Sequence, residues 1–128
     1  MANWTHGTFY WNELMTHDVE KAKRFYGATI GWTFDSMPMP EGGAYWVANM
    51  NGQPVGGIFV MSGPDFLGVP DSWMSYLAVD DVDARLKKAV AGGAQVCREP
   101  FDVEGVGRIA ILKEPGGAMV GWMTPAQS

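Results

Sequence analysis

Hydrophobic side chains along the chain fall into strand-like runs and helix-like stripes, and this order occurs twice. Residues 8–15 are rich in strand-forming side chains and lead directly into a helix signal. After Asp18, a good N-cap residue, apolar side chains recur at helical spacing. The apolar positions of this predicted helix are Val19, Ala22, Phe25 and Tyr26. We expect Gly27 or Gly31 to end the helix.

Three further strands are predicted in the first half of the chain. A turn rich in proline and glycine, from Pro38 to Gly43, separates the first of them from the second. Asn51-Gly52 is a strong two-residue turn signal, so the second and third strands should form a hairpin. The three predicted strands cover residues 32–36, 44–50 and 54–61.

The same order restarts after a break. Residues 62–72 hold two prolines and two glycines and are predicted to be a linker. A strand at 73–79 follows, and Asp81 is expected to cap a second helix that ends at Gly92-Gly93. The helix has its apolar stripe at Val82, Leu86, Ala89 and Val90, and the later predicted strands cover residues 95–99, 107–113 and 118–123.

The two halves therefore match. Asp18-Val19 opens the first predicted helix and Asp81-Val82 opens the second, an offset of 63 residues in a chain of 128. A repeat of about half the chain length indicates a duplicated module. We predict an α+β domain built from two βαβββ modules, whose curled mixed sheet forms a cup with the helices on its outer face. Module one covers residues 1–62, the linker 63–72 and module two 73–128, all within a single domain.

Composition restricts the function classes. Hydrophobic residues make up 47% of the chain and charged residues 18%, which suits a folded core. The net charge is −5 without a cluster of Lys or Arg, so we expect neither nucleic acid nor a membrane as a partner. The N-terminus does not resemble a signal peptide. Cys97 is the only cysteine, which excludes an intramolecular disulfide and fits a cytoplasmic protein.

Several segments together resemble the vicinal oxygen chelate superfamily of glyoxalases, bleomycin-resistance proteins and extradiol dioxygenases. The segments that carry the resemblance are residues 13–18, 22–26, 30–32, 77–84, 107–108 and 111–117. The sequence Trp11-Asn12-Glu13-Leu14 further resembles the Trp-x-Glu-Leu motif of glyoxalase-like proteins. The resemblance covers nearly the whole chain and implies the predicted fold, but the superfamily hosts many chemistries. It also implies a homodimer as one arrangement, in which chains exchange modules.

The resemblance implies where a divalent metal would be bound, and the residues there are unsuitable. Counting back seven residues from each capping aspartate gives Trp11 and Met74, and the position on the last strand is Gly121. None of these is a ligand for a hard metal ion. His6 and His17 are not expected to be ligands, although a register shift of two would place Glu13 in a ligand position. We therefore predict no metal and no cofactor.

Strand periodicity predicts a different lining for the cup. Alternate side chains of the first, fifth and last strands should share its face. Glu13 is the predicted proton carrier or polar anchor, with Tyr76 as a hydrogen-bonding partner to it or to a substrate oxygen. Alternatively, Glu13 has a structural role and pairs with Arg108. The predicted ligand-binding residues are Trp11, Met15, Trp46, Met74, Arg108 and Met119.

Three readings of function remain open. The first is a protein that binds a small, partly apolar or aromatic molecule in the cup without a metal. The second is a metal-independent lyase or isomerase with Glu13 as general base or acid. The third is a metal-dependent lyase or dioxygenase, against which the unsuitable residues at the expected ligand positions count.

Overall fold

The computed structural model describes residues 4–39, 42–103 and 105–126. The chain divides into two compact units. The first unit is Trp11–Trp73, and the second is Met74–Ser128 together with Met1–Tyr10. Each unit consists of one helix and a four-stranded mixed sheet, so the predicted α+β class and the two βαβββ modules are confirmed.

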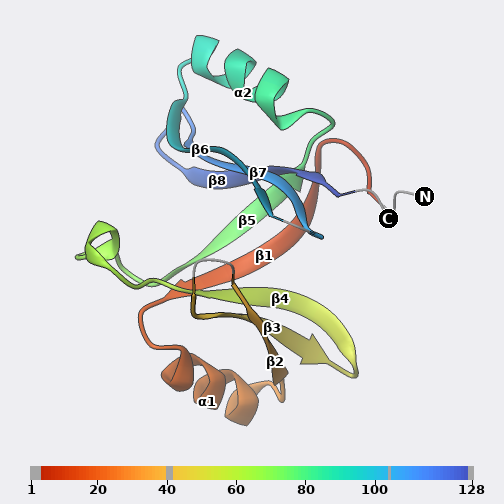
Figure 1. Ribbon diagram of the computed structural model, residues 1–128, viewed down its shortest axis with the longest axis vertical. Helices are drawn as coiled ribbons and strands as arrows, with labels where there is room; N and C mark the ends of the chain where they lie inside the picture. Colours follow the sequence, from red (N-terminus) through yellow and green to blue (C-terminus); the bar gives the residue numbers. More distant parts are fainter. Residues whose placement is uncertain (1–3, 40–41, 104, 127–128) are drawn as a thin grey trace. The chain divides into compact units, whose positions relative to one another are not determined.

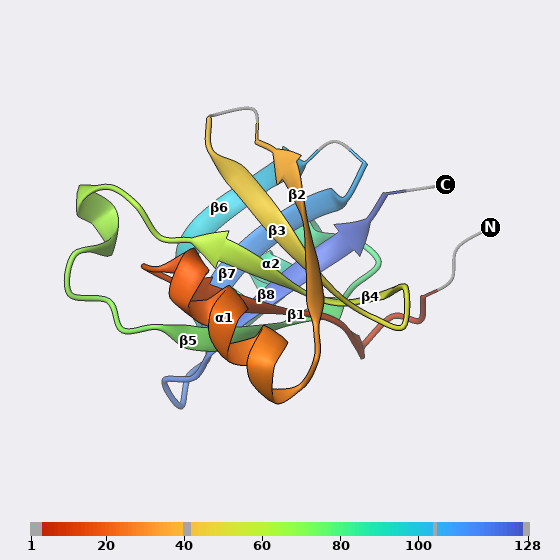
Figure 2. The same ribbon diagram turned by 90° about the horizontal axis from the view of Figure 1, so that it is seen from below.

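The first module contains one parallel and two antiparallel strand pairs. Its strand order is β2-β3-β4-β1, with β1 parallel to β4. Helix α1 lies along one face of this sheet (Figures 1 and 2). The elements are β1 (Thr8–Thr16), α1 (Val19–Thr29), β2 (Thr33–Pro38), β3 (Ala44–Met50) and β4 (Gln53–Val60).

The second module has the corresponding topology. Its strand order is β5-β8-β7-β6, with β5 parallel to β8, and α2 packs on one face of the sheet (Figure 1). The elements are β5 (Ser72–Ala78), α2 (Val82–Ala91), β6 (Gln95–Val103), β7 (Gly107–Lys113) and β8 (Met119–Pro125). The linker between the modules carries a short 3-10 helix, η1 (Pro64–Phe66).

Both helices begin as predicted. The carboxylate of Asp18 accepts a hydrogen bond from the backbone N–H of Lys21, and that of Asp81 accepts one from the N–H of Ala84. Of the two glycines expected to end α1, Gly31 does so with a φ of 91°, and its N–H donates to the carbonyl of Tyr26.

The two helices are covered to different extents. Helix α2 contributes Val82 and Leu86 to a hydrophobic core. The other buried members of this core are Val79, Ala94, Ala110, Leu112 and Val120. No residue of α1 is fully buried, and Phe25 is 58% exposed. Instead, aromatic rings pack beside α1, where Tyr26 stacks on Trp32 at 4.8 Å between ring centroids and Trp73 meets both edge-on.

Strand β6 differs from the prediction. It was expected to end at residue 99, but it continues through Pro100 to Val103. The pairing of β6 with β7 shifts register between Val96 and Arg98 and again between Arg98 and Phe101. Because β6 is the last strand in the order of its unit, a proline is tolerated at such an irregularity.

Neither helix in the described part of the chain has the length and hydropathy needed to cross a bilayer.

Candidate functional site

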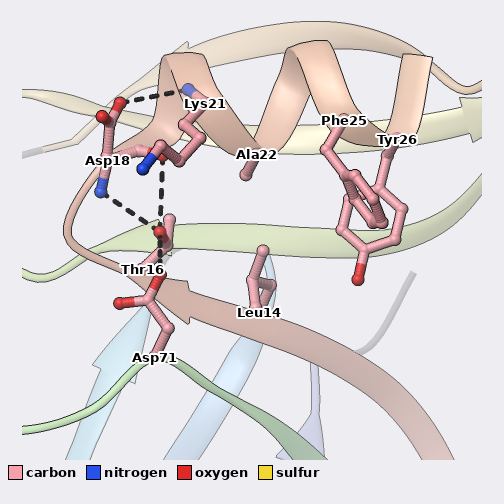
Figure 3. A pocket seen from close by; sticks show the side chains of 8 residues that line it. All are labelled: Leu14, Thr16, Asp18, Lys21, Ala22, Phe25, Tyr26 and Asp71. Carbon is pink, nitrogen blue, oxygen red and sulfur yellow. Dashed lines mark hydrogen bonds between the residues drawn. The ribbon is translucent and has the colours of Figure 1, made fainter. Parts of the chain in front are cut away.

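Backbone register places Glu13 on the face of the first sheet that α1 does not cover, which we call the helix-free face. Glu13 pairs with Gly57 of β4, and Val47 of β3 pairs with the same glycine from the other side. Paired residues share a face, and the face alternates along each strand. Trp11, Met15, Tyr45 and Phe59 therefore lie on the same face as Glu13. Leu14 points the opposite way, toward α1 (Figure 3).

Trp11, Tyr45 and Glu13 interact in series on this face. The indole Nε1–H of Trp11 donates to the hydroxyl oxygen of Tyr45 at 3.0 Å. The Tyr45 hydroxyl in turn interacts electrostatically with the nearby Glu13 carboxylate. Glu13 is only 8% exposed, so this contact offsets part of the cost of burying its charge.

The environment of Tyr45 keeps its hydroxyl protonated. Burial of the ring, together with the nearby Glu13 carboxylate, raises the pKa of the Tyr45 hydroxyl far above its ordinary value. Tyr45 is therefore a neutral hydrogen-bond donor over the whole physiological pH range.

A glycine makes room for this arrangement. A Cβ atom at Gly57 would overlap the hydroxyl oxygen and the Cζ atom of Tyr45. The tyrosine thus lies across β4 and reaches Glu13 on β1 only because residue 57 has no side chain. The sequence contained a signal for this, since a glycine inside a strand indicates a close approach of another group.

Trp46 was predicted to line the ligand site, and the structure corrects this placement. Its ring lies under the ammonium group of Lys23 on α1, 3.5 Å from the ring centroid. Because Trp46 follows Tyr45 directly in β3, it points to the opposite face of the sheet. Tyr45, which the sequence analysis did not single out, occupies the helix-free face instead.

Arg108, also predicted to be a ligand-binding residue, has carboxylate partners within its own unit. Its guanidinium group donates to both carboxylate oxygens of Asp83 on α2, with the shorter contact at 2.7 Å, and to Asp102 at 3.0 Å. It lies on the helix-covered face of the second sheet, where two carboxylates balance its charge. Arg108 is thus a structural link between α2, β6 and β7, and its two carboxylate partners in the second unit are Asp83 and Asp102.

The remaining predicted residues belong to the second unit. Tyr76 is buried on β5, and its ring lies over Gly121 of β8, so these two residues share a face as expected. Met74 is also buried. Met119 is 45% exposed, and its sulfur lies 3.7 Å from the Cys97 thiol.

A cavity of about 230 Å³ lies on the other side of the first sheet, between α1 and the end of β1 (Figure 3). The Thr16 hydroxyl donates to Asp71 at 2.5 Å and accepts from the backbone N–H of Asp18. The hydrogen bond from Thr16 lowers the pKa of the Asp71 carboxyl. These groups serve to cap α1 and to anchor the linker to β1, so we do not assign the cavity to the site on the helix-free face.

Comparisons with known proteins agree with this architecture. Residues 8–43 match the family described as bleomycin resistance protein-like N-terminal. The chain is 41% identical over 121 residues to CFP32 of Mycobacterium tuberculosis, which carries the name of a candidate glyoxylase, and the match covers 94% of this chain and 46% of CFP32. It is 31% identical over 129 residues to the anthracycline biosynthesis protein DnrV of Streptomyces peucetius, covering 92% of this chain and 47% of DnrV.

Solved structures share the fold at low sequence identity. The protein BH1468 of Bacillus halodurans has a TM-score of 0.72 and 10% identity, covering 97% of this chain and 98% of that one. Methylmalonyl-CoA epimerase of Streptomyces coelicolor has a TM-score of 0.71 and 18% identity, covering 96% of this chain and all of that one.

The partial family match, the relatives and the shared fold together make the chain similar to members of the vicinal oxygen chelate superfamily. The chain spans about half the length of the curated relatives it matches. Among residues 4–39, 42–103 and 105–126, no three His, Cys, Asp or Glu side chains converge in a way that could hold a metal ion. Trp11, Met74 and Gly121 occupy the positions where the superfamily resemblance implies ligands. The donor set described by the structure therefore does not fit a divalent metal.

Proposed function

We propose that this protein binds a small, partly apolar or aromatic molecule on the helix-free face of the first unit, without a metal ion. The observation that carries the proposal is the buried Glu13 carboxylate beside Trp11 and Met15, tied to Tyr45. Small-molecule sites are typically apolar walls with a few well-placed polar groups. The aromatic rings would stack on a planar ligand, and Glu13 would meet a cationic group or a hydroxyl.

The name of one relative supports the ligand class. DnrV is an anthracycline biosynthesis protein, and anthracyclines are planar aromatic molecules that carry hydroxyl groups and an ammonium group. An aromatic face and several hydrogen-bond donors are what Trp11 and Glu13 would recognise.

Fluorescence titration with doxorubicin, an intrinsically fluorescent anthracycline, tests the proposal. We expect saturable binding by the wild-type protein and an affinity lower by about tenfold in Trp11→Ala, since a stacking face is removed. Trp46→Ala is the matched control, because its ring lies on the helix-covered face, and it should bind as the wild type does. Equal affinities of Trp11→Ala and wild type would remove Trp11 from the site. Stoichiometric metal in the purified protein would overturn metal independence.

A second candidate function is a metal-independent lyase or isomerase with Glu13 as general base. A buried carboxylate with a fixed hydrogen-bond partner favours it, and the fold is shared with an epimerase. In the proton-transfer step, Glu13 would take a proton from a carbon next to a carbonyl group. The C–H electron pair would form a C=C bond while the π pair of the carbonyl moves to its oxygen, which gives an enolate, and return of the proton to carbon would restore the carbonyl.

Glu13→Gln separates the two functions. The wild type is tested for exchange, in D₂O, of the proton on the carbon next to the carbonyl group of a bound compound. If Glu13→Gln loses this exchange while keeping its affinity for the compound, Glu13 is catalytic. If the wild type shows no exchange and Glu13→Gln loses affinity, the site is a binding site.

A further inference from the structure

We infer that Tyr45 is a positioning residue for Glu13 and that, together with Trp11, it makes the site selective for ligands that donate a hydrogen bond to the carboxylate. This inference rests on the proposed function. It adds Tyr45 to the site and states that the ligand group bound at Glu13 is a hydrogen-bond donor.

The direction of the hydrogen bonds follows from the chemistry of the three groups. An indole N–H can only donate, so the Tyr45 oxygen must accept from Trp11. The Tyr45 proton then points to Glu13, whose carboxylate can only accept while it is ionised. The Trp11 N–H and the Tyr45 O–H thus both point toward the Glu13 carboxylate, which carries the negative charge.

This polarity sets the specificity of the site. A carboxylate has room for about four hydrogen bonds, so Glu13 can accept from a ligand in addition to its partners within the protein. An ammonium, hydroxyl or other N–H or O–H group is therefore favoured at Glu13. A ligand carboxylate or sulfonate at the same position would be repelled.

The position of the tyrosine ring is fixed by the backbone beneath it. Gly57 pairs with Glu13 on one side and Val47 on the other, so the ring crosses β4 at the level of the carboxylate. A Cβ atom at residue 57 would overlap the hydroxyl oxygen and displace it from both partners. Gly57→Ala therefore removes the contact while keeping the hydroxyl group, and Tyr45→Phe removes the hydroxyl group while keeping the ring.

Two measurements without ligand test the positioning role. The indole N–H signal of Trp11 is followed by ¹⁵N NMR and assigned with Trp11→Phe, and the Glu13 carboxyl carbon is titrated by ¹³C NMR and assigned with Glu13→Gln. In Tyr45→Phe and Gly57→Ala we expect the indole N–H to exchange faster with solvent and the carboxyl titration to move to higher pH, because a donor to the charged form is lost. Tyr10→Phe, at an exposed tyrosine on the strand that carries Trp11 and Glu13, should match the wild type. An unchanged indole signal and titration in Tyr45→Phe would overturn the inference.

Two planar probes test the specificity. Wild-type protein should bind proflavine, an aromatic cation with N–H donors, at least tenfold more tightly than anthraquinone-2-sulfonate, and this ratio should fall about tenfold in Tyr45→Phe. Equal binding of the two probes by the wild type would refute the selectivity. If the wild type binds neither probe, the proposed function fails, while the two NMR signals still decide whether Tyr45 positions Glu13. Melting temperatures of all variants show that each is folded.

Discussion

The ring of Tyr76 lies over Gly121, in the space that a Cβ atom of residue 121 would occupy. The two residues are paired in the parallel register of β5 and β8. In the first unit, the hydroxyl end of Tyr45 occupies the space over Gly57 of its neighbouring strand. Each module therefore contains a tyrosine that fills the space over a glycine of the adjacent strand, which makes both glycines sensitive to substitution.

Gly121→Ala should destabilise the protein. The added methyl group would overlap the Cδ2 and Cε2 atoms of Tyr76, and forcing extra volume into a packed site costs about 1–3 kcal/mol. The free energy of unfolding is measured by urea denaturation. Gly116→Ala is the matched control, since its Cβ would meet no atom within 4 Å, and its effect should stay within about 0.5 kcal/mol. Equal effects of the two substitutions would contradict the overlap.

Trp32→Ala should lower the free energy of unfolding by about 2–4 kcal/mol. The substitution removes the ring that stacks on Tyr26 and meets Phe34 and Trp73 edge-on. Because no residue of α1 is fully buried, this aromatic cluster is expected to provide much of the packing beside the helix. Leu67→Ala, at a side chain that is 79% exposed, is the control and should have little effect. A similar loss of unfolding free energy in Trp32→Ala and Leu67→Ala would show that the aromatic cluster does not stabilise the fold more than an exposed side chain does.

The two helix caps should be equivalent. Asp18→Ala and Asp81→Ala each remove a side chain that accepts from a backbone N–H in the first turn, and each should cost about 1 kcal/mol. Asparagine is about as good an N-cap as aspartate, so Asp18→Asn and Asp81→Asn should lose much less. Thermal and urea denaturation of the four variants provide the comparison. An alanine variant as stable as the wild type would show that its cap is not needed.

Asp80 should contribute to the acid sensitivity of the protein. The hydrogen bond from Arg85 lowers the pKa of the Asp80 carboxyl from 3.8 to about 2. A lowered pKa in the folded state gives a contribution that is fully present above the unfolded value and is lost as the pH falls from about 4 to about 2. Asp80→Asn should therefore flatten the fall in unfolding free energy over this interval. A fall in unfolding free energy that is as steep in Asp80→Asn as in the wild type would contradict this contribution.

Local signals in the sequence were sufficient to predict much of the fold. Asp18 and Asp81 start the helices because their short acidic side chains satisfy free backbone N–H groups. Asn51 and Gly52 both adopt positive φ, as a two-residue hairpin turn requires. The continuation of β6 through Pro100 was missed. A proline inside a strand is tolerated at a sheet edge or a bulge, and the local sequence does not show either feature.

The candidate site was harder to predict because it depends on which face each strand presents. On β1 the alternation was read correctly, so Trp11 and Glu13 share a face. On β3 no alternation argument supported Trp46, and because neighbouring residues of a strand point to opposite faces, Tyr45 lies on the helix-free face and Trp46 does not. The partners of Arg108 lie 25 and 6 residues away along the chain, on α2 and β6, and no local pattern indicates that they meet.

The prolines of the outer strands have a consequence for self-association. β2 ends in Pro38 and β6 contains Pro100, so each of these two strands lacks a backbone N–H donor at one position. The register shifts of β6 interrupt its hydrogen-bonding pattern further. An edge of this kind is a poor template for a strand from another molecule, which guards the folded chain against aggregation by sheet extension.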